Sequence, residues 1–216
     1  MMTKRYVTNE VRSKLSENLK NNGFKYIKSK ERIMREHEAG FDVIYSRIID
    51  YNPVFQIEFS IAIRLDAVEN IVNMFLGEEI INPQYKHLTS TIASSYDIMT
   101  NSEENYMEVN NEEELEKAIQ NLIKLIKDKG LCFFETYRDL NAANILKRTQ
   151  ILEDTSGLSY ILENLMQSLT LLKLCNDPDF DKLCDKYRKL YVPWVGQEKA
   201  GRKAMDDLIE YLRKLK

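Results

Sequence analysis

Histidine, glycine and proline are scarce in this chain of 216 residues, which has two, seven and four of them. Histidine is the commonest general base at neutral pH, and His37 and His87 lack the spacing of a metal-binding pair. Single, scattered glycines leave no phosphate-binding loop, dinucleotide fingerprint or nucleophile elbow. These absences argue against nucleotide-dependent enzymes, while a catalytic site built from dispersed residues stays open.

The three cysteines are odd in number, which argues against a disulfide framework. Cys175 and Cys184 have neither a C-x-x-C motif nor a nearby histidine, so zinc is not expected. Cys184 fits the buried stripe of a helix, and Cys132 lacks the basic neighbours that activate a thiolate.

The alternating carboxylates Asp177, Asp179 and Asp181 resemble the start of a calcium loop. Such a loop needs glycine and glutamate at later positions that Lys182 and Arg188 occupy here, so the calcium interpretation fails. The same residues are typical of a helix start, with a cap and a proline in the first turn. The sequence therefore predicts no metal or other cofactor.

Long hydrophobic runs are also missing, since none approaches the roughly 18–20 residues of a membrane helix. The N-terminal residues have no apolar core of a secretory signal. The net charge of -3 gives no support for the basic footprint of a nucleic-acid-binding protein. We expect a cytoplasmic globular protein that binds neither membranes nor nucleic acid.

The segment 54–65, VFQIEFSIAIRL, has the clearest pattern that is present. Apolar residues from Phe55 to Leu65 alternate with polar ones, which predicts a long strand with one buried and one polar face. Further strands are predicted near 24–28, 32–35, 41–51, 88–99 and 106–109, most of them joined by short turns. Short connections indicate an antiparallel meander of about five or six strands.

Helices are predicted at about 8–22, 66–77 and 111–130, each ended by a glycine. Asp66 with Glu69, and Asn111 with Glu114, have the spacing of helix-capping pairs. Gly130 is expected to end the third helix, before a further helical segment at about 136–147.

From residue 156 onward the pattern is wholly helical, with a last helix at about 197–214. The fold class is therefore α+β, with the sheet covered on one face by helices and followed by a helical C-terminal region. We predict a sheet domain at 1–150 and a helical region at 151–216 that packs on it as a bundle or forms a small subdomain.

The polar side of the long strand offers candidate ligand-binding residues, namely Gln56, Glu58, Ser60 and Arg64. If the sheet curls, they line a concave surface for a small polar ligand or a protein loop. An ordinary solvent-facing side is the alternative.

An acidic interval without Lys or Arg lies between Lys86 and Lys117. Clustered charge speeds and orients encounters, so a partner with a basic surface is one interpretation and a solvated loop is the other. The candidate partner-binding residues are Glu112, Glu113, Glu114 and Trp194, although Trp194 also suits helix packing.

Three segments resemble a family of bacterial proteins classed as a domain of unknown function: Gly23-Phe24-Lys25, Phe55-Gln56-Ile57-Glu58-Phe59 and Leu131-Cys132-Phe133-Phe134-Glu135. The resemblance covers roughly the first 150 residues. It implies an α+β domain without known catalytic residues, and some similar small bacterial proteins are thought to be immunity partners of toxins.

We therefore expect a non-enzymatic binding protein, with an immunity-type partner as one form of it. The alternative is a small-ligand module or an enzyme with Glu58 and Arg64 in a cleft.

Overall fold

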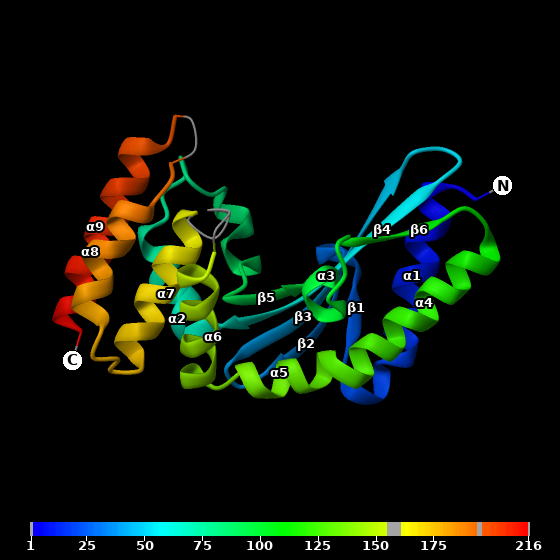
Figure 1. Cartoon of the computed structure of the whole chain (residues 1–216), viewed down its shortest axis with the longest axis horizontal. Coiled ribbons are helices and arrows are strands. Elements are labelled where there is room, and N and C mark those ends of the chain that lie inside the picture. Colours follow the sequence, from blue (N-terminus) through cyan, green and yellow to red (C-terminus); the bar gives the residue numbers. More distant parts are fainter. Residues whose placement is uncertain (1, 155–160, 194–195, 216) are drawn as a thin grey trace. The chain divides into compact units, whose positions relative to one another are not determined.

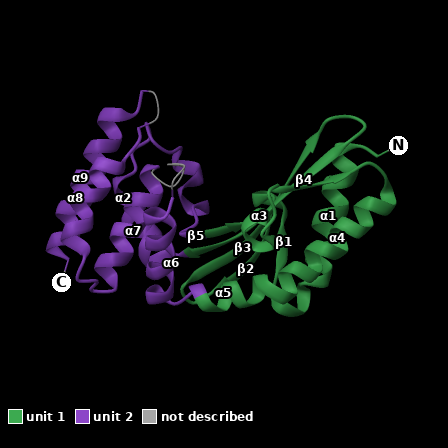
Figure 2. Cartoon of the chain, in the orientation of Figure 1, with its two compact units in different colours: residues 1–64, 93–136 green, residues 65–92, 137–216 purple. Residues whose placement is uncertain are grey.

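The computed structural model describes residues 2–154, 161–193 and 196–215. They form an α+β structure with a six-stranded antiparallel sheet, as the sequence predicts (Figure 1). Two compact units are present (Figure 2): Met1–Arg64 with Ala93–Thr136, and Leu65–Ile92 with Tyr137–Lys216. The units are interleaved along the chain, whereas the sequence predicts a single division near residue 150.

The sheet has the strand order β1-β2-β3-β4-β5. The sixth strand, β6, is not part of this order and also pairs with β4. β1 pairs antiparallel with β2, β2 with β3, and β4 with β6. The short predicted turns are confirmed between the first four strands. The strands are β1 (Lys25–Ile27), β2 (Arg32–His37), β3 (Gly40–Asp50), β4 (Phe55–Leu65), β5 (Ile92–Ser95) and β6 (Tyr106–Val109).

The alternation predicted for β4 is confirmed over its first half. Phe55, Ile57 and Phe59 are buried, and the intervening polar residues are half-buried. Beyond Ser60 every residue of β4 is buried. There the polar side becomes apolar, because Ala62 belongs to a buried cluster with Met34 of β2 and with Phe41 and Val43 of β3.

Helix α1 (Lys4–Asn18) begins earlier than predicted because Thr3 caps it by accepting a hydrogen bond from the Tyr6 amide. Thr8, where the predicted helix starts, lies inside α1 and donates to the Lys4 carbonyl. The 3-10 turn η1 (Lys20–Asn22) follows, and Gly23 ends it at a φ of 85°, which glycine adopts without strain. The apolar stripe of α1 packs against β3 and α4.

Helix α4 (Glu112–Leu125) has the predicted cap, since the Asn111 side chain accepts from the Glu114 amide. The prediction that Gly130 ends this helix is wrong. Gly130 closes a π-helical turn, η4 (Ile126–Gly130), which leads straight into α5 (Leu131–Tyr137). A Cβ at Gly130 would lie 3.3 Å from Ile126 Cγ2 of the same turn and at an ordinary contact distance of 3.6 Å from Ile61 Cδ1 of β4. The missing side chain therefore relieves crowding mainly within the π-helical turn.

The segment predicted as a strand at 88–99 is a strand only at β5, which α3 (Tyr96–Thr100) follows directly. In the second unit, the expected capping pair of α2 is also wrong. Leu65 holds the N-cap position without a side-chain bond, and Glu69 is buried inside the unit. The remaining elements are η2 (Lys28–Lys30), α2 (Asp66–Phe75), η3 (Pro83–Leu88), α6 (Leu140–Leu152), α7 (Leu162–Leu174), α8 (Phe180–Leu190) and α9 (Glu198–Lys214).

In the C-terminal region the buried position predicted for Cys184 is confirmed, since Cys184 is buried on α8 together with Phe180, Leu183 and Tyr187. None of the helices in the described part of the chain combines the length and hydrophobicity that a bilayer crossing needs.

Candidate functional site: a basic groove along α1

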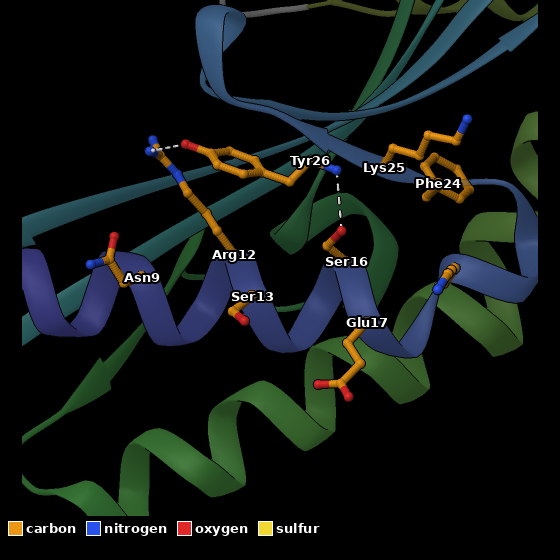
Figure 3. A pocket seen from close by; sticks show the side chains of 9 residues that line it. Asn9, Arg12, Ser13, Ser16, Glu17, Phe24, Lys25 and Tyr26 are labelled. Atoms are coloured by element: carbon orange, nitrogen blue, oxygen red, sulfur yellow. Dashed lines mark hydrogen bonds between the residues drawn. The ribbon is translucent and has the colours of Figure 1, made fainter.

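A hollow of about 680 Å³ lies between α1 and the edge strand β1 in the first unit (Figure 3). Its size falls in the range of ligand-binding pockets, roughly 300–1,000 Å³. The residues that line it are Asn9, Arg12, Ser13, Ser16, Glu17, Lys20, Phe24, Lys25 and Tyr26.

The spacing of α1 places its polar residues in this hollow. Asn9, Arg12 and Ser16 follow one another at intervals of three and four, so they share one face of the helix. Lys20 lies just beyond the helix, in the turn η1. The buried stripe of α1 faces the sheet instead. The turn at Gly23 then brings the chain back, so that β1 forms the opposite wall (Figure 3).

Two hydrogen bonds tie the walls together. Arg12 Nη1 donates to the Tyr26 hydroxyl at 3.1 Å, and the Tyr26 amide donates to Ser16 Oγ at 3.1 Å (Figure 3). The Arg12 guanidinium carbon also lies 5.6 Å from the centre of the Tyr26 ring. Because Ser16 occupies the Tyr26 amide, this donor of the edge strand is not offered to an incoming strand. This leaves the polar and charged side chains as the groups best placed to hold an occupant of the hollow.

A second hollow, of about 590 Å³, adjoins the first and shares Asn9 and Arg12 with it. We call the two hollows together the α1 groove. The second one is lined by Lys4, Arg5, Thr8, Asn9, Arg12, Glu31, Ser46, Arg47 and Ile48.

The α1 groove is strongly basic. Its cations are Lys4, Arg5, Arg12, Lys20, Lys25 and Arg47, against the two acids Glu17 and Glu31. Arg12 approaches Glu31 at 3.5 Å. The charged ends of Lys4, Arg5, Lys20 and Lys25 make no ion pair with the described residues, and all four residues are exposed. The groove thus presents unneutralised positive charge beside hydroxyl groups, which suits carboxylate or phosphate oxygens.

The predicted ligand-binding residues Gln56, Glu58 and Ser60 lie along one side of β4. Gln56 Nε2 donates to Glu108 Oε1 at 3.1 Å, and Glu58 Oε2 lies 3.4 Å from Arg47 Nη1. Glu58 and Ser60 line a pocket of about 370 Å³. The pocket also includes Tyr45, Arg47, Phe59, Ser95 and Asn105.

Arg64, the fourth predicted ligand residue, does not line this pocket. It is 5% exposed, and its guanidinium carbon lies 5.9 Å from the Phe41 ring centre. The apolar cluster at this end of β4 accounts for the burial. Glu58 and Arg64 are therefore not brought together in that pocket.

The predicted partner residues Glu112, Glu113 and Glu114 are exposed in the first turn of α4. Glu114 has a structural role, because its carboxylate accepts from the Asn110 amide at 2.8 Å. This bond, together with bonds from the side chains of Asn110 and Asn111, lowers the pKa of Glu114. Trp194 lies outside the described residues.

The charged neighbours of His37 suggest a solvated hairpin tip. His37 does lie at the tip of the β2–β3 hairpin, where it pairs with Gly40, but its side chain is not solvated. Its side chain is 10% exposed, and its Nε2 lies 3.2 Å from Oδ1 of the fully buried Asp42. Cys184 is buried as expected, and burial raises the pKa of its thiol to about 11. Among the described residues, no three His, Cys, Asp or Glu side chains are grouped so that they could hold a metal ion.

Sequence reasoning missed the α1 groove because its residues resemble the solvated face of an ordinary amphipathic helix. The available signal was a surplus of Lys and Arg, with few acids, between Lys4 and Arg35. The groove exists only because β1 folds back beside that face, which the spacing of α1 alone does not show.

Comparison with known proteins yields no match to a family model, a curated protein or a solved structure.

Proposed function

We propose that this chain is a binding protein and that its α1 groove receives an acidic segment of a protein partner. The observation that carries the proposal is the set of cations in the α1 groove that make no ion pair with the described residues, namely Lys4, Arg5, Lys20 and Lys25. The proposal includes the immunity-type role expected from the sequence, with an acidic partner in place of a basic one.

Charge and shape favour an acidic polypeptide. The cations along the groove outnumber the acids six to two, and charged surfaces of this kind steer oppositely charged partners. Phe24 is buried and Tyr26 is held by Arg12 and Ser16, so the groove offers no free aromatic ring for base stacking. A protein segment therefore fits this surface better than a single-stranded nucleic acid.

The length of the groove sets the size of the segment. α1 has 15 residues, which at about 1.5 Å per residue gives roughly 22 Å. An extended chain rises about 3.3 Å per residue, so about seven residues span the groove. Glutamates at alternate positions would place several carboxylates beside the cations.

The test uses a fluorescein-labelled peptide of alternating glutamate and tyrosine, about eight residues long. Fluorescence anisotropy should detect binding to the wild-type chain that weakens as salt is raised. The double variant Lys20→Glu/Lys25→Glu should bind at least about tenfold more weakly, because two attractive contacts become repulsive. Both lysines are exposed, so the fold should tolerate the change.

The matched control is Lys186→Glu/Lys189→Glu on α8, which changes the net charge equally at two exposed positions. Its affinity should equal that of the wild-type chain. An equal loss in both variants, or no binding to the wild-type chain, would contradict the proposal.

A small polar ligand in the β4 pocket is the second candidate function. The support for it is that Glu58, Ser60 and Arg47 line one hollow of about 370 Å³. The burial of Arg64 removes one of the groups on which this candidate depended. Ser60→Ala distinguishes the two sites, because Ser60 lines the β4 pocket and not the α1 groove. It should leave the affinity for the acidic peptide unchanged if the α1 groove binds it.

The prediction of a basic partner at Glu112 and Glu113 can be examined with the same peptide assay. A lysine–tyrosine peptide should bind the wild-type chain and lose affinity for Glu112→Lys/Glu113→Lys if the acidic surface is used. The α1 groove predicts that the glutamate peptide binds more tightly than the lysine peptide.

A further inference from the structure

A buried polar cluster joins α2, α6 and α7 within the second unit. Lys147 of α6, Gln167 of α7 and Glu69 of α2 are 5%, 3% and 0% exposed. Lys147 Nζ donates to Gln167 Oε1 at 2.8 Å, and Gln167 Nε2 donates to Glu69 Oε1 at 2.8 Å. An amine, a carboxamide and a carboxyl group thus follow one another in a site sheltered from solvent.

We propose that Lys147 and Gln167 join in an intramolecular isopeptide bond, with Glu69 as the group that moves the proton. The reacting groups are already within reach. A carbonyl bond is about 1.23 Å long, so the Gln167 Cδ lies within about 4.0 Å of Lys147 Nζ. A near-attack distance is about 3–3.5 Å, which a small side-chain adjustment supplies.

The surroundings of Lys147 favour a nucleophilic amine. Burial lowers its pKa to about 8, against the opposing influence of the carboxylates Glu69 and Glu163. At pH 7 roughly one Lys147 amine in ten is then neutral, a far larger share than for an exposed lysine. In the structure Nζ donates to Gln167 Oε1, Asn164 Oδ1 and the Thr91 carbonyl, which uses all three protons of the charged amine. Deprotonation removes one of these bonds and frees the lone pair for attack on Gln167.

Glu69 is placed to handle the proton. Its Oε1 accepts from the leaving nitrogen of Gln167 and from the Thr91 hydroxyl. Its Oε2 is buried and has no hydrogen-bond partner among the described residues. A buried oxygen without a partner is costly, and a role in taking up a proton gives a reason for it.

The reaction balances without a further reactant. Nζ of neutral Lys147 forms a bond to Cδ of Gln167, and the Cδ–Nε2 bond breaks. Glu69 takes the proton that Nζ loses and returns it to Nε2, which leaves as ammonia. The chain loses about 17 Da, the mass of one ammonia molecule.

Asn164 is the competing amide, since Lys147 Nζ also donates to its Oδ1 at 2.8 Å. Gln167 is favoured because its amide nitrogen is bonded to Glu69, and it is held further by the Ser90 carbonyl at 3.0 Å. This arrangement gives the leaving group of Gln167 a proton donor.

The test is the intact mass of the denatured wild-type chain, before and after incubation of the folded protein at neutral and mildly alkaline pH. The linked fraction should be about 17 Da lighter and should form faster as the pH rises through 8. Peptide mapping should find Lys147 joined to Gln167, which distinguishes the link from ammonia loss at an asparagine.

The variant Glu69→Gln keeps the shape of the side chain and should retain the sequence mass. Lys173→Arg on α7 is the matched control and should link like the wild-type chain. A wild-type chain that stays at its sequence mass, a link that maps to Asn164, or a Glu69→Gln chain that links normally would overturn the proposal. The mass and map of the wild-type chain decide the matter even if Glu69→Gln fails to fold.

Discussion

Charged side chains in this protein differ greatly in how much their removal should lower the free energy of unfolding. Arg35 packs against both the Phe24 and the Phe134 ring, with its guanidinium carbon 4.6 and 5.6 Å from their centres. Its Nε donates at 2.8 Å to Asp42, which is fully buried. Arg47 also has a carboxylate partner, Glu58, but its side chain is 76% exposed.

We expect Arg35→Ala to lower the free energy of unfolding by roughly 3 kcal/mol, because it leaves the buried Asp42 carboxylate short of a partner. Arg47→Ala should cost less than about 1 kcal/mol, as exposed ion pairs do. Urea unfolding followed by circular dichroism measures both values. Equal losses would mean that the buried cluster contributes no more than a surface pair.

The start of α4 is an element whose stability should depend on both its cap and pH. Asn111→Ala removes the acceptor for the Glu114 amide and should cost roughly 1 kcal/mol. Asn121→Ala, the same change at an exposed position inside α4, should instead stabilise the chain by a few tenths of a kcal/mol. Thermal unfolding of the two variants measures the contrast, and a loss of stability in both would contradict it.

The pKa of Glu114 is lowered in the folded chain, chiefly by the bond from the Asn110 amide. Its stabilising contribution is therefore complete above the ordinary pKa of 4.5 and disappears as the pH falls through the lowered value. Glu114→Gln should accordingly flatten the acid side of the stability profile.

Sequence patterns over a few neighbouring residues predicted the features that those same residues determine. The alternation of β4 and the cap of α4 are examples, because neighbouring residues determine them. Gly130 was misleading because a glycine commonly ends a helix, whereas this one lies inside a continuous helical path and relieves crowding against Ile126. Glu69 was misleading because its partner, Gln167, lies 98 residues away in the sequence. The α1 groove was missed for the same reason, since β1 supplies one of its walls.

At the scale of the whole molecule, the interleaving of the two units predicts how a truncated chain behaves. The face of α2 is covered by elements far along the chain: Gln167 of α7 reaches Glu69, and the Tyr211 ring of α9 lies 5.5 Å from the Phe75 ring. A fragment of residues 1–150 lacks both of these helices.

We expect this fragment to bind a hydrophobic dye and to lose cooperative unfolding, because the apolar face of α2 is left without its cover. Adding the separate fragment 151–216 should reverse both effects, and the full chain is the control. A fragment 1–150 that unfolds in one cooperative transition and binds no dye would instead support the division near residue 150.

The same interleaving has a consequence during synthesis on the ribosome. Glu69 leaves the exit tunnel 98 residues before Gln167 does. At translation rates of about 5–20 residues per second, α2 therefore waits roughly 5–20 s for α7. During that interval the nascent chain displays an amphipathic helix whose Val68 and Val72 are later fully buried. Such a segment is a natural target for ribosome-associated chaperones, and the second unit can assemble only after this delay.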